Sequence, residues 1–236
     1  MRLLFRVLSF LLFAALTMHA SNFTLCPGAA AQGGFGNSFT SAASGGACST
    51  SVTMSITSAT DYAKLTWNSS STGYPPGLTV GQLTNMNAIV HQTGPNNPFY
   101  MFAFIDASNS LGQTAATDQI LFIQFQSSTV SGINMPFSNT TSLFNLYDND
   151  TGVYLQGGQS DTHTLAGWIG LYPFLSSKSL DEIRIGIGLG GGAAPGGSLQ
   201  VDSVTGATNV PEPGSSALLA SGLIGLAGVM RRKLHR

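Results

Sequence analysis

The chain has 236 residues, of which 43% are hydrophobic and 8% are charged, and its formal net charge is −1. Between residues 21 and 209 three basic side chains accompany nine acidic ones, a balance of 3 − 9 = −6. This composition excludes nucleic-acid binding, which needs clustered lysine and arginine. Residues 21–209 are enough for one large β-sandwich domain, which we expect there.

The N-terminal residues have the pattern of a secretory signal peptide. Arg2 and Arg6 supply positive charge, residues 3–16 are almost wholly apolar, and Ala20 is a small residue at a candidate cleavage point. The apolar run is shorter than the roughly 20 residues that a membrane-spanning helix needs. We therefore predict a signal helix over residues 1–20 that directs export, with an uncleaved membrane anchor as the alternative.

Cys26 and Cys48 are the only cysteines in the chain. In an exported protein such a pair is more often a disulfide than a metal site or a catalytic thiol. Lipid attachment to Cys26 is the alternative, but it needs small residues before the cysteine, and Leu25 is bulky. We predict a disulfide that pins a stretch rich in glycine, alanine and serine.

Residues 21–209, which we call the body, consist of short apolar runs separated by glycine, proline, asparagine and aspartate. Apolar residues do not recur there every 3.6 positions, as they would in an amphipathic helix. Strands are predicted over 52–57, 62–67, 99–106, 119–125, 143–147, 153–156, 166–172, 182–189 and 198–204. Many short strands without helices are typical of an antiparallel β-sandwich. The predicted fold class is therefore all-β, a jelly-roll-like antiparallel sandwich flanked by an N-terminal signal helix and a C-terminal transmembrane helix.

Two short motifs have the spacing of ligand sites but fit turns better. Asp148 and Asp150 begin a D-x-D-x-G pattern between two predicted strands, which is typical of a hairpin turn. They are the candidates for a calcium site, but the later ligands of a calcium loop are missing. Gly186, Gly188 and Gly191 have the spacing of a dinucleotide motif, but no helix follows them. We predict neither a metal nor a cofactor.

The residues that catalysis would need are few. His91 and His163 are the only histidines outside the terminal segments, and Asp161 shares one face of an extended chain with His163. The sequence contains neither G-x-S-x-G nor H-E-x-x-H, and its scattered acids cannot be paired across a cleft. We predict no catalytic residue and a protein that is not an enzyme.

Four aromatic residues lie among polar or glycine-rich neighbours: Trp67, Tyr74, Trp168 and Tyr172. Carbohydrate-binding sandwiches place exposed tryptophan and tyrosine rings against the apolar faces of sugars, although burial is the commoner fate of tryptophan in a strand. Trp67 and Trp168 are therefore the candidate ligand-binding residues of the body.

The C-terminal end has three parts. Pro211, Glu212 and Pro213 can continue neither a strand nor a helix, because each proline lacks an N–H and fixes φ. Residues 214–230 are uncharged and rich in leucine, alanine and glycine, just long enough for a spanning helix. A basic cluster then stops transfer and stays on the cytoplasmic side. This cluster consists of Arg231, Arg232, Lys233 and Arg236.

Together these parts resemble the PEP-CTERM sorting signal of Gram-negative bacteria, which the membrane enzyme exosortase recognises. The resemblance covers residues 210–236, and a plain membrane anchor after a proline linker is the alternative. It implies that Pro211, Glu212 and Pro213 are the recognition element, that the basic cluster is the stop-transfer element, and that the partner is an exosortase-type processing enzyme. The C-terminal helix would hold the chain in the membrane before processing.

Residues 182–206 are also loosely similar to the last strands of the jelly-roll bodies common in PEP-CTERM proteins, some of which resemble carbohydrate-binding modules. The expected function is a non-enzymatic structural or interaction role linked to exopolysaccharide or biofilm. The expected location is the cell envelope, then the outer surface or extracellular matrix. A carbohydrate-binding module on the same anchor and a secreted hydrolase are the alternatives.

Overall fold

A computed structural model describes residues 19–58, 60–94, 98–106, 110–112, 119–125, 134–188 and 197–210. Residues 22–208 form one compact unit, and of the second unit only residues 19–21, 209 and 210 are described, as the ends of two strands. The rest of the predicted signal helix and of the predicted sorting segment lies outside the described residues. Within the ranges above, no helix is long and apolar enough to cross a membrane.

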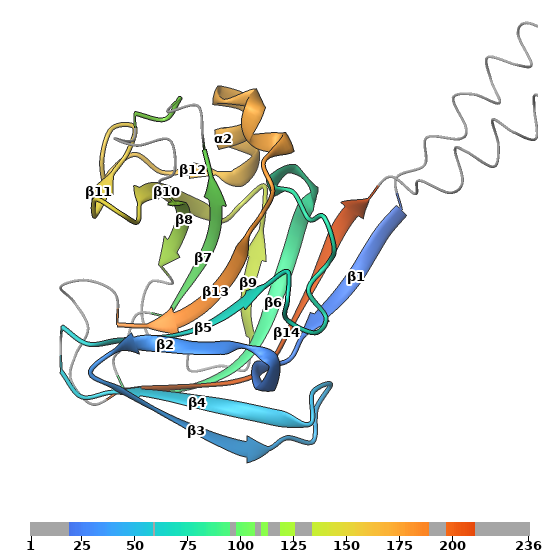
Figure 1. Ribbon diagram of the computed structural model, residues 1–236, viewed down its shortest axis with the longest axis vertical. Coiled ribbons are helices and arrows are strands. Elements are labelled where there is room, and N and C mark those ends of the chain that lie inside the picture. Colours follow the sequence, from blue (N-terminus) through green and yellow to red (C-terminus); the bar gives the residue numbers. More distant parts are fainter. Residues whose placement is uncertain are drawn as a thin grey trace, which may run out of the picture. The chain divides into compact units, whose positions relative to one another are not determined.

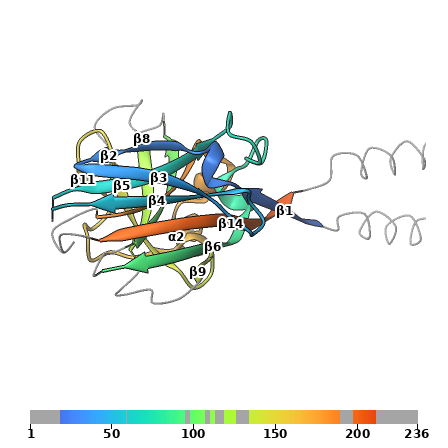
Figure 2. The same ribbon diagram turned by 90° about the horizontal axis from the view of Figure 1, so that it is seen from below.

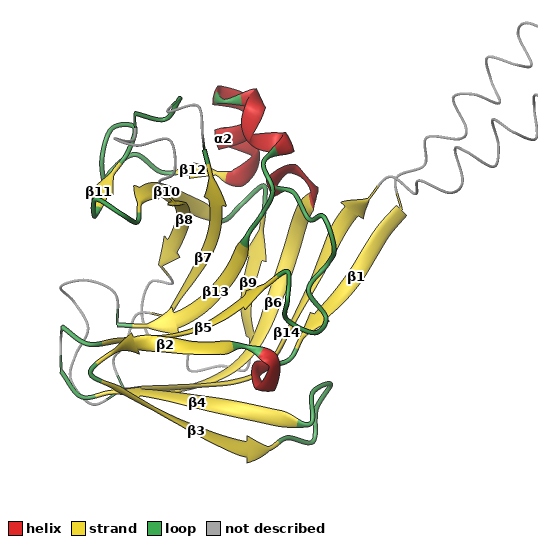
Figure 3. Ribbon diagram, viewed as in Figure 1, coloured by secondary structure: helices red, strands yellow, loops and turns green. Residues whose placement is uncertain are grey.

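Two antiparallel sheets make up most of the described chain (Figure 1; Figure 3). The first sheet has the order β3 (Asn37–Ala43), β4 (Thr50–Ile56), β14 (Ser198–Val210), β6 (Leu83–Thr93) and β9 (Asn134–Ser138), and β1 (His19–Leu25) pairs with β14. The second sheet has the order β11 (Val153–Tyr154), β10 (Leu143–Asp148), β8 (Gln119–Phe125), β7 (Pro98–Ile105), β13 (Glu182–Ile187), β5 (Tyr62–Asn68) and β2 (Ala31–Phe35), and β12 (His163–Thr164) pairs with β10. The short helices are η1 (Pro27–Ala29), η2 (Val80–Gln82), α2 (Leu165–Leu171) and η3 (Pro173–Ser177).

The chain crosses repeatedly between the two sheets. The chain changes sheet at each step from β4 to β5, β6 and β7, and it crosses again from β13 to β14. The resulting orders, β4-β14-β6-β9 and β5-β13-β7-β8, are those of a jelly roll. Figure 2 shows β4, β14, β6 and β9 side by side in the first sheet. The prediction of an all-β fold with antiparallel sheets is confirmed, and the strand order agrees with a jelly-roll-like sandwich.

The core lies between the sheets, because alternation along each strand turns one row of apolar side chains inward. In the first sheet β4 contributes Val52, Met54 and Ile56, and in the second sheet β13 contributes Ile183 and Ile185. All five side chains are buried in one cluster. One set of inward residues from each sheet therefore holds the sandwich together.

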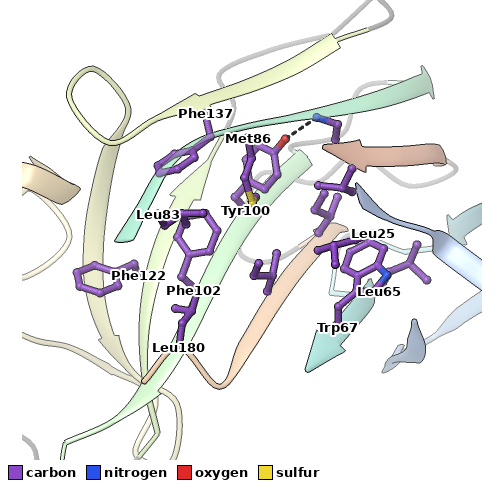
Figure 4. Packing of buried hydrophobic residues seen from close by; sticks show 14 of the residues in the cluster. Leu25, Leu65, Trp67, Leu83, Met86, Tyr100, Phe102, Phe122, Phe137 and Leu180 are labelled. Carbon is purple, nitrogen blue, oxygen red and sulfur yellow. Dashed lines mark hydrogen bonds between the residues drawn. The ribbon is translucent and has the colours of Figure 1, made fainter. Parts of the chain in front are cut away.

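Tyr100 links the two sheets by hydrogen bonds. It lies on β7 of the second sheet, and its hydroxyl accepts the N–H of Ala88 on β6 at 2.9 Å (Figure 4). The same hydroxyl donates to the carbonyl of Met135 on β9. Burial raises the pKa of Tyr100 well above its usual value, so the phenol stays neutral and keeps the proton that it donates.

One predicted strand is a helix. The run 166–172 lies mostly in α2, and the side chain of Thr164 caps the first turn by accepting a backbone N–H at 3.0 Å. Leu165 and Trp168, three positions apart, are the buried residues of the helix. The strand prediction is wrong here. The glycines of this run lower its helix propensity, so the helical spacing of the two buried residues, Leu165 and Trp168, is not apparent in the sequence.

The predicted disulfide between Cys26 and Cys48 is confirmed. Cys48 is buried, and the backbone oxygen of Cys26 accepts the indole N–H of Trp67 on β5 at 2.9 Å. The bond closes the segment that carries β2 and β3, the edge strands of the two sheets. It therefore fastens a part of the chain that contributes little to the core.

Candidate functional site

The outer face of the second sheet, away from the core, holds a groove of about 410 Å³. Its wall is formed by β5, β7, β8, β10, β11 and β13 together with the turn between β10 and β11. The lining side chains are Tyr62, Lys64, Met101, Leu121, Ile123, Phe125, Tyr147, Asn149, Gly152, Tyr154 and Arg184. A volume of this size falls in the range of small-molecule and cofactor sites.

The floor of the groove is apolar because two central strands carry apolar side chains on both faces. Along β7, Phe99 and Met101 point outward while their neighbours Tyr100 and Phe102 point into the core. A continuous apolar run of this kind is typical of a strand that is buried on both sides. The outward residues form a second apolar cluster, separate from the core. Its buried members are Phe99, Met101, Ala103, Leu121 and Ile123.

Gly186 explains how the Phe99 ring fits above the sheet. The two residues are directly paired between β13 and β7, and a Cβ atom on Gly186 would lie 2.3 Å from the Phe99 ring. It would also lie 2.2 Å from the backbone oxygen of Ala63. A side chain cannot be accommodated there. The first glycine of the predicted dinucleotide-like spacing therefore serves packing in a strand, which confirms that the run begins as a strand.

Aromatic residues stand at both ends of the groove. Tyr147 and Tyr154 are paired between β10 and β11, and their ring centres are 5.1 Å apart with an edge-to-face angle of 71°. Burial raises the pKa of Tyr154, and Tyr147 raises it further. Tyr62 lies on β5, which is five strand spacings from Tyr154 on β11. At about 4.8 Å per spacing, the two residues are about 24 Å apart along the sheet. The exposed Phe35 on β2 pairs with Tyr62 and shares its face.

A polar network crosses the same face. Arg184 on β13 donates from Nε to Glu182 Oε2 at 2.6 Å and from Nη2 to Gln119 Oε1 at 2.6 Å. Gln119 Oε1 also accepts from Asn149 Nδ2 at 3.3 Å. These contacts connect β13, β8 and the β10–β11 turn, so the guanidinium and the amides have fixed positions.

Lys64 is the other cation of the groove. It lies half-buried on β5, and burial lowers its pKa. The positive charge of Arg184 lowers the pKa of Lys64 further, whereas Glu182 acts in the opposite direction. The groove therefore combines an apolar floor, phenol rings and cationic hydrogen-bond donors.

Neither Trp67 nor Trp168, the two candidate ligand-binding residues, lies in this groove. Trp67 is 0% exposed and lies in the core with Leu25 and Leu65 (Figure 4), and Trp168 is 1% exposed. The indole N–H of Trp168 donates to the backbone oxygen of Phe144 at 2.9 Å. The expectation that these rings are exposed is wrong: the alternation of β5 and the inward face of α2 both direct tryptophan to the core.

The D-x-D-x-G segment is the turn between β10 and β11, as predicted. Asp148 Oδ1 accepts the backbone N–H groups of Asp150 at 3.0 Å and Thr151 at 3.2 Å, and Gly152 has a φ of 74°. Asp150 Oδ2 accepts the N–H of Gln119 at 2.8 Å. Both carboxylates accept hydrogen bonds from backbone N–H groups. The described ranges contain no group of three or more potential metal ligands.

Asp161 and His163 do meet, with Oδ1 and Nε2 2.9 Å apart. The imidazole also lies edge-on against the Trp168 ring, with ring centres 4.6 Å apart. Residue 163 directly precedes the cap of α2, so the pair packs at the start of that helix rather than in the groove. The predicted sorting residues Pro211, Glu212 and Pro213 lie outside the described residues.

Fold and groove together define a β-sandwich with a ligand-sized groove on the outer face of one sheet. At its C-terminal end, over residues 209–233, the chain carries the PEP-CTERM protein-sorting motif. This match includes the Pro-Glu-Pro segment and most of the basic cluster. It implies that the protein is exported and sorted at the membrane by an exosortase, as in Gram-negative bacteria. No curated protein matches the sequence.

Several solved structures match this chain at low similarity. A solution structure of the module CtCBM11 is 11% identical, covering 82% of this chain and 98% of its own, with a TM-score of 0.43. A family 11 carbohydrate-binding module from Clostridium thermocellum, in complex with a mixed-linked tetrasaccharide, is 11% identical, covering 78% and 94%, with a TM-score of 0.38. The low-affinity xylan-binding module CBM86 from Roseburia intestinalis is 10% identical, covering 80% and 96%, with a TM-score of 0.36.

Proposed function

We propose that this is an exported, non-enzymatic binding protein whose groove takes a polysaccharide chain outside the cell. The observation that carries the proposal is the groove on the second sheet, where tyrosines at both ends stand over an apolar floor. The sorting motif supports the setting, because export and sorting at the membrane would bring the protein to where extracellular polysaccharide is found. A role in exopolysaccharide or biofilm follows from this proposal.

The lining matches the chemistry of sugars. A pyranose ring has an apolar face that packs against an aromatic ring, and hydroxyl groups that need hydrogen-bond partners. Tyr62, Tyr147 and Tyr154 supply rings, and each phenol can also donate and accept. Lys64 and Asn149 add donors at the wall. An extended groove about 24 Å along the sheet, at about 4.8 Å per strand, suits a chain of sugars better than one sugar.

A secreted hydrolase has less support. The polar groups on the described lining are phenols, an amide, an ammonium and a guanidinium, which hold a sugar by hydrogen bonds. Cleavage of a glycosidic bond uses two carboxyl groups that flank it. The Asp161–His163 pair lies at the start of α2 and not on the groove lining. The binding role therefore fits the lining better than catalysis does.

For the chain as a whole, we propose a signal peptide over residues 1–20, a binding body over 21–209 and a sorting segment over 210–236. In the sorting segment Pro211, Glu212 and Pro213 would be read by the processing enzyme, and the basic cluster would stop transfer. The mature protein would then present its groove at the outer surface or in the matrix.

The test is binding of the purified mature protein to a panel of soluble polysaccharides by affinity electrophoresis and calorimetry. Tyr154→Ala should weaken binding at least about tenfold, or about 1.4 kcal/mol, because it removes a ring from the groove. Leu171→Ala is the matched control, since Leu171 is an exposed apolar side chain outside the groove and should leave affinity unchanged. Unchanged affinity in Tyr154→Ala, or no binding to any polymer, would refute the proposal.

A further inference from the structure

The positive charge of the body is concentrated in the groove. Residues 21–209 contain three basic side chains and nine acidic ones, and two of the three bases, Lys64 and Arg184, line the groove. The third, Lys178, is bound to the buried carboxylate of Asp106 at 2.8 Å. The body has a net charge of 3 − 9 = −6, and its two other basic side chains, Lys64 and Arg184, lie together on the lining of the groove.

The charge of Arg184 is already compensated. Its Nη2 lies 2.5 Å from Glu182 Oε2 and its Nε lies 2.6 Å from the same oxygen. The side chain is only 5% exposed, and Gln119 accepts a further hydrogen bond from it. The pair contributes little net charge to the groove, so a ligand would meet mainly the remaining cation.

Lys64 forms no ion pair of its own, and the carboxylate that acts on its charge from a distance, Glu182, is already bound by Arg184. The residues directly opposite it on the two neighbouring strands are Gly186 on β13 and Gly33 on β2, and neither has a side chain that could pair with it. A Cβ atom on Gly33 would lie 3.4 Å from Lys64 Cε, so the lysine stem packs over this glycine. Among the described residues, no hydrogen bond or ion pair to Lys64 is found. A half-buried ammonium without a partner is unfavourable unless an anion reaches it.

We infer that the groove selects an acidic polysaccharide, and that an anionic substituent on one sugar, a carboxylate or a sulfate ester, binds the ammonium of Lys64. This inference rests on the proposed function and adds the class of ligand to it. Such a contact is a charge-assisted hydrogen bond, which is stronger than one between neutral groups. The rings of Tyr62 and Tyr154 would pack against the sugar chain at the two ends of the groove, while Lys64 would bind the sugar that carries the negative charge.

The experiment compares acidic with neutral polymers on the purified mature protein. Polygalacturonate supplies carboxylates, dextran sulfate supplies sulfate esters, and dextran and xylan supply neutral chains. We expect at least one acidic polymer to bind at least about tenfold more tightly than the neutral ones, with affinity that falls as salt rises. Which acidic polymer binds distinguishes carboxylate from sulfate recognition.

Lys64→Gln should lose about tenfold in affinity for the acidic polymer and much less for a neutral polymer, because the glutamine amide can still donate a hydrogen bond to a sugar hydroxyl. Lys64→Arg keeps the charge and should keep most of the acidic binding. Because Lys64 has no partner to lose, Lys64→Gln should also unfold at the same temperature as the wild type, or higher. A large drop in its unfolding temperature would show that Lys64 serves the fold, and would overturn the inference.

The failure of the inference differs from the failure of the proposed function. If acidic and neutral polymers bind equally and Lys64→Gln changes neither, the selection by charge is wrong while polysaccharide binding stands. If Tyr154→Ala leaves affinity unchanged, or if no polymer binds to the wild type, both the inference and the proposed function are refuted.

Discussion

Breaking the Cys26–Cys48 bond should destabilise the sandwich by a predictable amount. The cysteines are separated by 22 positions, and the entropy of closing such a loop in the unfolded chain corresponds to about 3.4 kcal/mol at 25 °C. The closed segment contains β2 and β3, whose side chains are exposed or half-buried throughout. Packing within the segment therefore cannot replace the cross-link. We expect most of the calculated loss to be observed.

The assay is urea unfolding of the oxidised and the reduced wild-type protein. The reduced protein keeps both sulfur atoms, so the difference isolates the cross-link, and Cys26→Ala/Cys48→Ala should behave like the reduced form. With a slope of about 2 kcal/mol per molar urea, the midpoint should fall by about 1–2 M. A loss below about 1 kcal/mol would refute the loop argument and show that contacts of β2 and β3 hold the segment.

Three further predictions concern single residues. Trp168→Phe should lower the free energy of unfolding by about 1–3 kcal/mol, measured by urea unfolding, because it leaves a buried backbone carbonyl without its donor. Hydrogen bonds from the side chains of Ser58 and Thr57 lower the pKa of Asp61 below 3.8, so its stabilisation is complete above that pH and is lost as pH falls through the folded pKa. Asp61→Asn should therefore be less stable than wild type at pH 7 and approach it in acid, in unfolding curves recorded from pH 7 to pH 2. Glu212→Ala should keep the C-terminal tail, whereas the wild type should end near the Pro-Glu-Pro segment. The measurement is the intact mass of each protein recovered from envelope and medium. A tail retained in both would show that the C-terminal segment is only a membrane anchor.

The sequence predicts the strands that supply the core because their pattern is local. In β4 the buried Val52, Met54 and Ile56 alternate with polar residues, and this alternation is visible without a structure. β2 and β3 were not predicted, because glycine, alanine and serine carry no apolar period when a strand lies at an edge. β6 is not predicted although Met86 and Val90 repeat at an even spacing, since Asn85 and Asn87 on either side of Met86 suggest a loop.

The groove could not be predicted because its residues meet only through sheet order. Lys64 on β5 and Tyr154 on β11 are 90 positions apart in the sequence, and no local pattern relates them. One signal was available: in β7 Phe99, Met101 and Ala103 are apolar at the positions that should face water in a one-sided strand. When apolar side chains occupy both sets of alternate positions in a strand, they indicate that its second face is also covered or carries a ligand.

The two outer faces of the sandwich differ in their chemistry, and the difference bears on the proposed binding surface. On the first sheet most outward positions of β6 and β14 are polar, with Ile89 and Ala207 as the exceptions, and His91 Nε2 lies 3.1 Å from Asp202 Oδ2 in an exposed pair. A sandwich needs only its inner faces to be apolar, so this sheet follows from folding alone. The second sheet places Met101 and Ile123 on its outer side, with Tyr154 beside them. Folding of a two-layer sandwich does not require this second apolar cluster, and buried apolar side chains that line a groove outside the core are typical of ligand sites. The asymmetry therefore supports the second sheet as the surface of the proposed binding function, independently of any one lining residue.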